Sequence, residues 1–365
     1  MRVSLICLAR RGGMVHFHGE LVSALAELIP TVAITAKTAV SFHDSTKAIR
    51  LNVNTGAGAF GTFFYAINPL TWFRIFQALK ESNADVFHLV APHEWNLILG
   101  FLIKLLRKPL IYTVHDPEHH LGAPLYIRIL ENIFRRMPDG FIVLSKLARQ
   151  ELQSMGFPAD RVFYVPIAAY SHFSKMHRPE ARPEKAILFF GRIEPYKGLD
   201  LLLKAMSEVF VEFPDWKLIL AGAGDLSRYR SYLNSSQIEV INRYISDEDV
   251  AGLMLRSRFV VLPYTEATQS GVVPIAYAFG RPVIATNVGS LSEMVLDGKT
   301  GLIVSPADPV ALASAIKRLT LDQELCEEMG RTAYKMSRED WSPGGNARAH
   351  LEVYSIVGRR YERLN

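Results

Sequence analysis

The sequence contains very little cysteine and no long apolar run, and both shortages exclude classes of protein. Its two cysteines, Cys7 and Cys326, lie far apart and inside predicted elements. This usage argues against a disulfide framework and favours a reducing compartment, so we expect a cytoplasmic protein. The apolar run over residues 97–103 ends at Lys104 and is much shorter than the ~20 residues that span a bilayer. The apolar run over residues 3–8 is too short for a signal peptide and lacks a small-residue cleavage site, so we interpret it as a strand.

Sets of metal ligands are also lacking. His16 lies near His18, and His119 precedes His120, but neither pair has the i, i+4 spacing that places two ligands on one helix face. No cysteine or carboxylate set surrounds either pair in the sequence. We therefore expect no metal site.

The positive charge is concentrated in the first half of the chain. The net charge is +5, and residues 1–175 hold 18 Lys and Arg against 12 Asp and Glu, whereas the remainder holds 23 against 24. The excess is consistent with an anionic membrane surface or an acidic partner, and equally with an ordinary solvated surface. We expect no nucleic-acid partner.

Strand and helix patterns alternate along both halves of the chain and predict an α/β protein with two Rossmann-like domains facing a cleft. We expect an N-terminal domain over residues 1–170, in which residues 39–66, rich in Gly, Thr and Asn, are irregular. A polar linker follows over residues 171–184. A C-terminal domain then covers residues 185–345, and a terminal helix covers residues 346–365.

The stretch from Ala186 to Met206 combines a buried strand, a loop with two cations and an amphipathic helix. Gly191 and Arg192 follow the strand directly, and Lys197 precedes the helix. Ligands of parallel sheets bind at the carboxyl ends of the strands, and a guanidinium with an ammonium group suits a diphosphate. The alternative is a connection whose cations face water.

Other loops repeat this arrangement. Gly12 and Gly13 lie between a strand and a helix, His115 ends a buried strand, and Gly222 follows another strand. Glycine amides at a helix start suit a phosphate, and a histidine in such a place can stabilise developing charge or be purely structural. After the strand that ends near Tyr264, amides and side chains suited to a phosphate are predicted at Gln269, Ser270, Gly271 and Val272.

The order of these motifs resembles the retaining, nucleotide-sugar-dependent glycosyltransferases of family 4, which have the GT-B fold. The matching residues are Gly12-Gly13, His115-Asp116, Gly191-Arg192 with Lys197-Gly198, Gly222-x-Gly224-Asp225, and Gly280-Arg281-Pro282 through Thr286 followed by Gly289 and Glu293. The resemblance covers nearly the whole chain and is strongest over residues 186–306.

The resemblance implies a role for each matching position. Arg192 and Lys197 would hold the donor diphosphate, and His115 would lie near the donor sugar and the reacting carbon. Gly12 and Gly13 would face the donor or acceptor. The family requires no metal or other cofactor, its terminal helix crosses back to the first domain, and the donor base would contact the backbone near Tyr244 and Ile245.

One departure from the family concerns a pair of glutamates. Their positions are occupied here by Ala267 and Ile275, and Glu266 is one residue away from the first. The segment Ala-Thr-Gln-Ser-Gly at 267–271 resembles a variant subgroup. The donor sugar and base, UDP or GDP, therefore stay open, as do a nucleotide-sugar epimerase or hydrolase and a non-catalytic nucleotide-binding homologue.

The predicted acceptor side combines aromatic and basic residues. The helix predicted over residues 125–137 carries three arginines, and Trp72, Phe73, Arg74 and Phe76 form a second group. Peripheral contact with an anionic membrane fits both groups, and the alternative is that the aromatics are core and the arginines are solvated. We expect a glycosyltransferase that moves a sugar onto a glycan or lipid-linked acceptor in polysaccharide or glycoconjugate biosynthesis.

Overall fold

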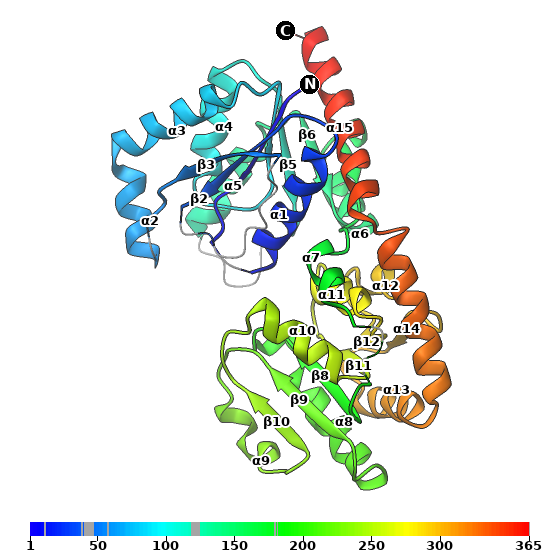
Figure 1. Cartoon of the computed structure of the whole chain (residues 1–365). Helices are drawn as coiled ribbons and strands as arrows, with labels where there is room; N and C mark the ends of the chain where they lie inside the picture. Colours follow the sequence, from blue (N-terminus) through cyan, green and yellow to red (C-terminus); the bar gives the residue numbers. More distant parts are fainter. Residues whose placement is uncertain are drawn as a thin grey trace. The chain divides into compact units, whose positions relative to one another are not determined.

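The chain folds into two compact units, each built on a parallel sheet (Figure 1). The computed structural model describes residues 1–10, 12–37, 39, 47–56, 58–117, 125–178, 180 and 182–364. The first unit comprises Met1–Ala168 and Pro343–Asn365, and the second comprises Ala169–Ser342. Across this described part of the chain, no helix has both the length and the hydropathy that crossing a bilayer requires.

The sheet of the first unit has the strand order β3-β2-β1-β4-β5-β6-β7, and every pairing is parallel. β1 lies between β2 and β4, with Val3 paired to Thr31 on one side and Val86 on the other. The chain thus builds outward in two directions from β1. The strands are β1 (Val3–Cys7), β2 (Thr31–Ala36), β3 (Ile49–Val53), β4 (Val86–Leu89), β5 (Leu110–Val114), β6 (Gly140–Val143) and β7 (Val162–Tyr164).

The helices of the first unit cover the sheet and enclose an apolar core. Alternate residues of β4 and β5, such as Phe87 and Tyr112, belong to one cluster with Ile75, Leu99 and Phe134 from three helices. The helices are α1 (Gly13–Ala26), α2 (Gly58–Ile67), α3 (Pro69–Glu81), α4 (Asn96–Leu105), α5 (Leu125–Phe134), α6 (Lys146–Ser154), α15 (Pro343–Leu364) and the 3-10 turn η1 (Ala159–Arg161).

The C-terminal helix α15 packs in the first unit beside α1 (Figure 1). Its Tyr354 hydroxyl lies 2.8 Å from Nδ1 of His88, whose Nε2 lies 2.7 Å from Oγ1 of Thr113 in β5. His350 is also fully buried. Helix and sheet are therefore joined by buried polar groups as well as by apolar contacts, and the terminal helix returns to the first domain as the family resemblance implied.

The sheet of the second unit has the order β10-β9-β8-β11-β12-β13, again parallel throughout. Alternate strand residues, Ile187 and Phe189 among them, pack with α8 and α13 in one core cluster. The strands are β8 (Ala186–Phe190), β9 (Lys217–Ala221), β10 (Ile238–Ile241), β11 (Phe259–Leu262), β12 (Val283–Thr286) and β13 (Gly301–Val304).

Several helices of the second unit begin with the side-chain caps that the sequence favours. Ser246 accepts a hydrogen bond from the Asp249 amide, and Asp308 accepts bonds from the Val310 and Ala311 amides. The helices are α7 (Ser171–Met176), α8 (Leu199–Glu212), α9 (Arg230–Leu233), α10 (Asp247–Arg256), α11 (Val272–Ala278), α12 (Leu291–Met294), α13 (Pro309–Leu321), α14 (Gln323–Arg338) and the 3-10 turns η2 (Pro195–Lys197) and η3 (Ser227–Tyr229).

Two stretches differ from the sequence interpretation. Residues 39–66, predicted to be irregular, contain β3 and most of α2, and residues 38, 40–46 and 57 lie outside the described residues. The stretch predicted as a linker contains α7, whose Phe173 is buried in the second unit. The predicted pair His119 and His120 also lies outside the described residues.

Candidate functional site

The strand order of the second unit changes direction at β8. The chain leaves β8 toward β9 on one side, and β11 later pairs with the other side of β8. Loops that follow two such strands separate at the carboxyl edge, and ligands of open α/β sheets bind there. The loops after β8 and β11 contain the predicted residues Arg192, Lys197, Gln269 and Ser270. The structure therefore places the predicted donor loops on both sides of this switch point.

The loop after β8 is held close to the loop after β9. Ile193 donates its amide hydrogen to the Ala223 carbonyl, and Gly191 donates to the Ala221 carbonyl. Gly222 has φ +150°, and a Cβ there would lie 1.8 Å from the Gly191 carbonyl oxygen. Only glycine permits this approach at Gly222, and the φ of +133° at Gly191 favours glycine there for its backbone conformation.

Arg192 extends from this loop toward solvent. Its side chain is 76% exposed, and Nη1 lies 3.4 Å from Oε1 of Glu194. A pair this long and exposed contributes little to stability. The guanidinium is thus available to an anion without first breaking a strong ion pair.

Lys197 lies in an aromatic environment. Its Nζ is 3.8 Å from the centroid of the Tyr264 ring and 5.1 Å from that of Tyr196. Burial lowers the pKa of the Lys197 ammonium to about 8, and the nearby charge of Arg192 also lowers it. The two rings stabilise the cation through their quadrupoles but provide no negative charge. A bound phosphate would supply the charge that this half-buried ammonium lacks.

Backbone contacts fix Lys197 against the loop after β11. The Thr265 amide donates to the Tyr196 carbonyl at 2.8 Å. The next residue after Lys197 is Gly198, which begins α8 with φ +66°, and a Cβ there would lie 1.8 Å from the Pro263 carbonyl oxygen. The two loops that flank the switch point therefore form one connected structure.

The remainder of the loop after β11 is organised by serines. Ser270 is buried, its Oγ lies 3.4 Å from the Tyr264 hydroxyl, and it accepts a hydrogen bond from the Val272 amide. The Ser290 hydroxyl donates to the Thr268 carbonyl. Gly271 precedes α11, Gln269 is half-buried, and Glu266 is exposed on this loop.

The residues predicted at the base site differ in exposure. Both follow β10 and precede α10; Tyr244 is exposed, whereas the Ile245 side chain is buried. Arg243, beside them, forms an ion pair of 2.7 Å with Asp249.

The predicted residues of the first unit lie at the carboxyl edge of its own sheet. Gly12 has φ +86° and precedes α1, which begins at Gly13. His115 follows β5, is buried, and donates from Nε2 to the Val90 carbonyl at 2.8 Å. Burial lowers the pKa of His115, so the ring is neutral near pH 7 and Nδ1 carries no proton.

Three further residues were not identified from the sequence. Tyr196 and Tyr264 surround Lys197 but are 68 positions apart, so no local pattern connects them. In the first unit, Arg10 follows β1 and donates to the Thr55 carbonyl and the Thr62 hydroxyl. Its position directly after the first strand was the available signal.

Acidic, histidine and cysteine side chains do not gather into a metal site anywhere in the described ranges. The cationic groups around the switch point in the second unit, Arg192 and Lys197, are therefore the ones to which an anionic ligand can be assigned. Together with the Ser270 hydroxyl, they suit a diphosphate bound at the carboxyl edge.

Two family descriptions match this chain. Residues 11–168 match the family described as Glycosyltransferase Family 4, and residues 184–322 match the family described as Glycosyl transferases group 1. The chain belongs to glycosyltransferase family 4. The two matches correspond to the two sheets, so both units of this glycosyltransferase carry family sequence.

Named relatives of this glycosyltransferase act on different molecules. The phosphatidyl-myo-inositol mannosyltransferase of Mycobacterium tuberculosis is 26% identical over 95% of this chain and 88% of its own length. The alpha-D-kanosaminyltransferase of Streptomyces kanamyceticus is 24% identical over 78% of each. The family matches and these relatives show that the chain is a hexosyltransferase.

Solved structures share the GT-B fold of this glycosyltransferase. Anabaena HepE in complex with UDP and glucose superimposes with a TM-score of 0.77 at 16% identity, over 97% of this chain and 99% of the other. Sucrose-phosphate synthase from Thermosynechococcus elongatus gives 0.76 at 20% identity, over 97% and 98%.

Proposed function

We propose that this glycosyltransferase transfers a sugar from a nucleoside diphosphate donor to a glycan or lipid-linked acceptor, with retention of the anomeric configuration. The observation that carries the proposal is the environment of Lys197. Its ammonium is fixed between the two loops of the switch point, has aromatic partners, and lies on the same loop as the exposed guanidinium of Arg192. This pair of cations matches a diphosphate leaving group.

The proposed chemistry breaks the bond between the anomeric carbon and the donor phosphate oxygen. The leaving diphosphate keeps the bonding electron pair, and Arg192 and Lys197 stabilise its growing negative charge. The acceptor oxygen bonds to the anomeric carbon on the face that the diphosphate leaves, which retains the configuration, and its proton passes to the departing diphosphate oxygen. Arg192 and Lys197 would thus supply the stabilisation for which other enzymes use a metal ion, and we propose that no metal or other cofactor is needed.

His115 and the base-contacting residues have positioning roles in this proposal. The neutral His115 ring would accept a hydrogen bond from a donor hydroxyl, since its Nε2–H is already given to Val90. Gly12 and Gly13 would allow close approach of the sugar. The donor base would lie against the backbone of Tyr244 and Ile245.

The loop after β11 departs from the family pattern, and this departure affects which donor the enzyme binds. Ile275 stands where the family resemblance places a second glutamate, and its side chain is buried in α11. The exposed Glu266 could substitute for the first glutamate, whereas no residue of this loop replaces the second. Turnover assays with a panel of UDP- and GDP-sugars would identify the donor.

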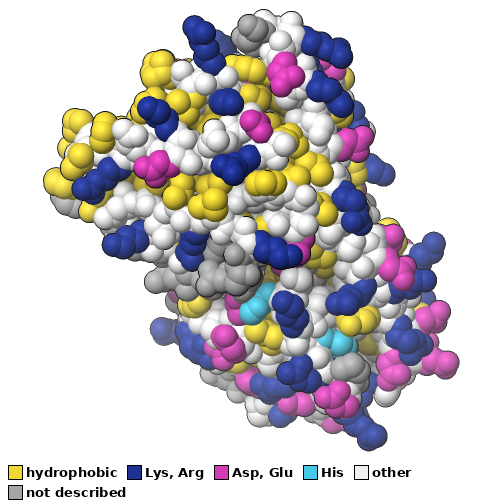
Figure 2. Space-filling view, turned by 45° about the horizontal axis from the view of Figure 1, so that its top comes forward, with side chains coloured by type: hydrophobic (Ala, Val, Ile, Leu, Met, Phe, Trp, Pro, Cys, Tyr) yellow, Lys and Arg dark blue, Asp and Glu magenta, His cyan; other side chains and the backbone are white. Residues whose placement is uncertain are grey.

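A lipid-linked acceptor is supported by the surface of the first unit. Figure 2 shows hydrophobic side chains gathered with Lys and Arg on this unit. The exposed apolar residues come from α2, α3, α4 and α5 and are flanked by exposed arginines. The named target of the mycobacterial relative is likewise a lipid. The exposed apolar residues are Phe63, Phe64, Ile67, Leu70, Phe73, Ile98, Phe101, Leu105, Leu125, Tyr126, Ile129, Leu130 and Ile133, and the arginines are Arg74, Arg128 and Arg136.

We extend the proposal to peripheral binding at an anionic membrane, because aromatic and basic residues together bind such surfaces. The enzyme would then act at the cytoplasmic face in polysaccharide or glycoconjugate biosynthesis.

The direct test is a product assay with radiolabelled UDP- and GDP-sugars and a bacterial lipid extract. Transfer of label to the lipid or glycan fraction supports the proposal. Release of free or epimerised sugar without any acceptor-dependent product would support the rival hydrolase or epimerase. Nucleotide binding without any turnover would support a non-catalytic nucleotide-binding homologue.

A further inference from the structure

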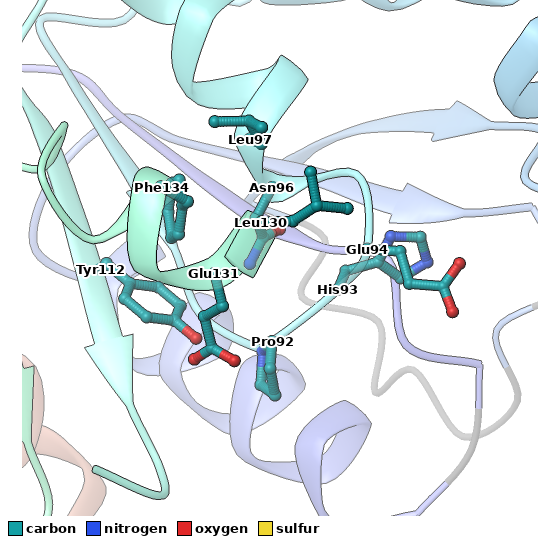
Figure 3. A pocket seen from close by; sticks show the side chains of 9 residues that line it. All are labelled: Pro92, His93, Glu94, Asn96, Leu97, Tyr112, Leu130, Glu131 and Phe134. Carbon is teal, nitrogen blue, oxygen red and sulfur yellow. The ribbon is translucent and has the colours of Figure 1, made fainter. Parts of the chain in front are cut away.

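A cavity of about 220 Å³ lies in the first unit between α4 and α5, above β5 (Figure 3). Leu97 of α4 and Leu130 and Phe134 of α5 provide apolar walls, and the Tyr112 ring from β5 provides another. Glu131 and the Tyr112 hydroxyl point toward the end near Pro92 (Figure 3). The walls are therefore mainly apolar, and polar groups come from Glu131 and Tyr112 at this end and from His93, Glu94 and Asn96.

The walls of the cavity belong to the core and are well fixed. The rings of Tyr112 and Phe134 pack edge to face with centroids 4.9 Å apart, and both are buried. Glu131 accepts a hydrogen bond of 2.7 Å from Arg135, which is itself buried and donates to the Pro117 and Asp116 carbonyls. The polar end thus carries an anchored carboxylate, and burial raises the pKa of Tyr112, so its hydroxyl stays protonated.

The cavity is continuous with the exposed apolar surface of α5. Leu130 lines the cavity and is also 37% exposed, and Leu125, Ile129 and Ile133 on the same helix are exposed as well. Apolar residues at this spacing form one stripe along a helix. An alkyl chain leaving a lipid surface could thus enter the cavity past Leu130 while staying in contact with apolar side chains.

The polar end of the cavity lies at the carboxyl edge of the sheet. Pro92, His93 and Glu94 follow β4, and the cavity residue Tyr112 belongs to β5, which ends just before His115. In a parallel sheet, the ends of both strands share one edge. A headgroup leaving the cavity near Pro92 would therefore emerge on the edge that carries the predicted residues Gly12 and His115.

We infer that this cavity binds an alkyl segment of the lipid acceptor and holds the attached headgroup at the carboxyl edge. The inference rests on the proposed function and specifies its acceptor as one with a single chain inserted between α4 and α5. The volume agrees with this occupant. Whole-ligand pockets measure roughly 300–1,000 Å³, whereas an apolar cavity of roughly 150 Å³ already holds a benzene ring. A cavity between these values takes part of a ligand.

The experiment uses n-alkyl β-D-glucosides of increasing chain length, each below its micelle-forming concentration, titrated calorimetrically into the full chain. Affinity should rise about fourfold for each added CH2 until the cavity is filled, and then level off. Leu130→Trp fills the cavity and should abolish the dependence on chain length. Ile129→Trp, one position along the same helix and outside the cavity lining, should retain it.

Leu97→Trp closes the cavity from α4 and provides a second blocking variant if Leu130→Trp fails to fold. Binding that increases equally in Leu130→Trp and Ile129→Trp would overturn the inference, because the chain would then lie on the exposed surface. The inference is also overturned if no glucoside binds. A parallel titration with UDP and GDP separates the two claims. Binding of UDP or GDP without binding of the glucoside alkyl chain would refute the cavity inference alone. If the wild type binds neither nucleotide, the proposed function is refuted.

Discussion

The ammonium nitrogen of Lys197 lies 3.8 Å from the centre of the Tyr264 ring, although the two residues belong to loops that follow different strands. The contact joins the loop after β8 to the loop after β11 at the point where the sheet changes direction. The Tyr264 ring also stabilises the ammonium charge of Lys197 through its quadrupole. The predictions below begin from this relationship.

The pH dependence of donor use should report Lys197. Its pKa of about 8 in the free enzyme means that the ammonium charge is lost as the pH rises through this value. We expect kcat/KM for the donor to fall above about pH 8. The fall in kcat should occur at higher pH, because the bound diphosphate favours the charged lysine. Steady-state kinetics from pH 6 to 10 would measure both, and a flat kcat/KM across pH 8 would contradict the assignment.

Replacing Gly198 should destabilise the second unit. Gly198→Ala puts a Cβ 1.8 Å from the Pro263 oxygen at a backbone with φ +66°, so a loss of about 1–3 kcal/mol is expected in the free energy of unfolding. Gly252→Ala is the matched control. Gly252 lies in α10 with open space around it, so alanine there should raise the free energy of unfolding by roughly 0.5–1 kcal/mol. Urea denaturation compares them, and equal effects would refute the argument.

Stability of the first unit should fall in mild acid. Burial lowers the pKa of His18 and of His350 to about 4, from 6.5 in the unfolded chain. Between pH 6.5 and 4 the unfolded chain therefore binds more protons, and stability decreases as the pH falls through this window.

His350→Leu tests that account, since leucine removes one buried group that must stay neutral. The free energy lost between pH 7 and 4.5 should shrink by roughly 1–3 kcal/mol relative to the wild type. Urea denaturation at each pH provides the values. Unchanged pH dependence in the variant would show that the burial of His350 does not contribute to the loss of stability in acid.

Membrane binding should depend on the apolar residues of α2. Phe63→Ser with Phe64→Ser removes two exposed rings and should weaken binding to vesicles of mixed phosphatidylglycerol and phosphatidylcholine by at least about tenfold. Val211→Ser, which replaces an exposed apolar residue of α8 in the second unit, should leave binding unchanged. Cosedimentation measures both. Equal binding of all three proteins would remove the support for a membrane surface on α2.

The sequence predicts the buried strands far better than the surface elements. The strand predicted over residues 3–8 is β1, and the buried strand predicted at the start of the stretch from Ala186 is β8, because strands buried on both faces form continuous apolar runs. β3 was missed because it is an edge strand interrupted by Arg50 and Asn52. Helix α2 was missed because glycines occupy it and because Phe63 and Phe64 are exposed, which conceals the helical periodicity.

Some features of the candidate site are predictable from adjacent residues, whereas others depend on contacts between residues far apart in the sequence. Arg192 and Lys197 are predictable because strand, loop and helix follow one another directly in the sequence. The contact of Lys197 with Tyr264 depends on β11 pairing with β8, a relationship that no local pattern contains. The burial of His115 and its bond to Val90 depend equally on the packing of separate strands.

The most direct test of the central claim is calorimetric binding of nucleoside mono- and diphosphates to the wild type, Arg192→Ala and Lys197→Met, with Lys204→Ala as the control. Lys204 is an exposed lysine of α8, outside the switch-point loops. The wild type and Lys204→Ala should bind UDP or GDP roughly 10- to 100-fold more tightly than the matching monophosphate, because the second phosphate gains charge-assisted hydrogen bonds. Arg192→Ala and Lys197→Met should lose this preference. A preference that persists in both variants, or is absent from the wild type, would contradict the account.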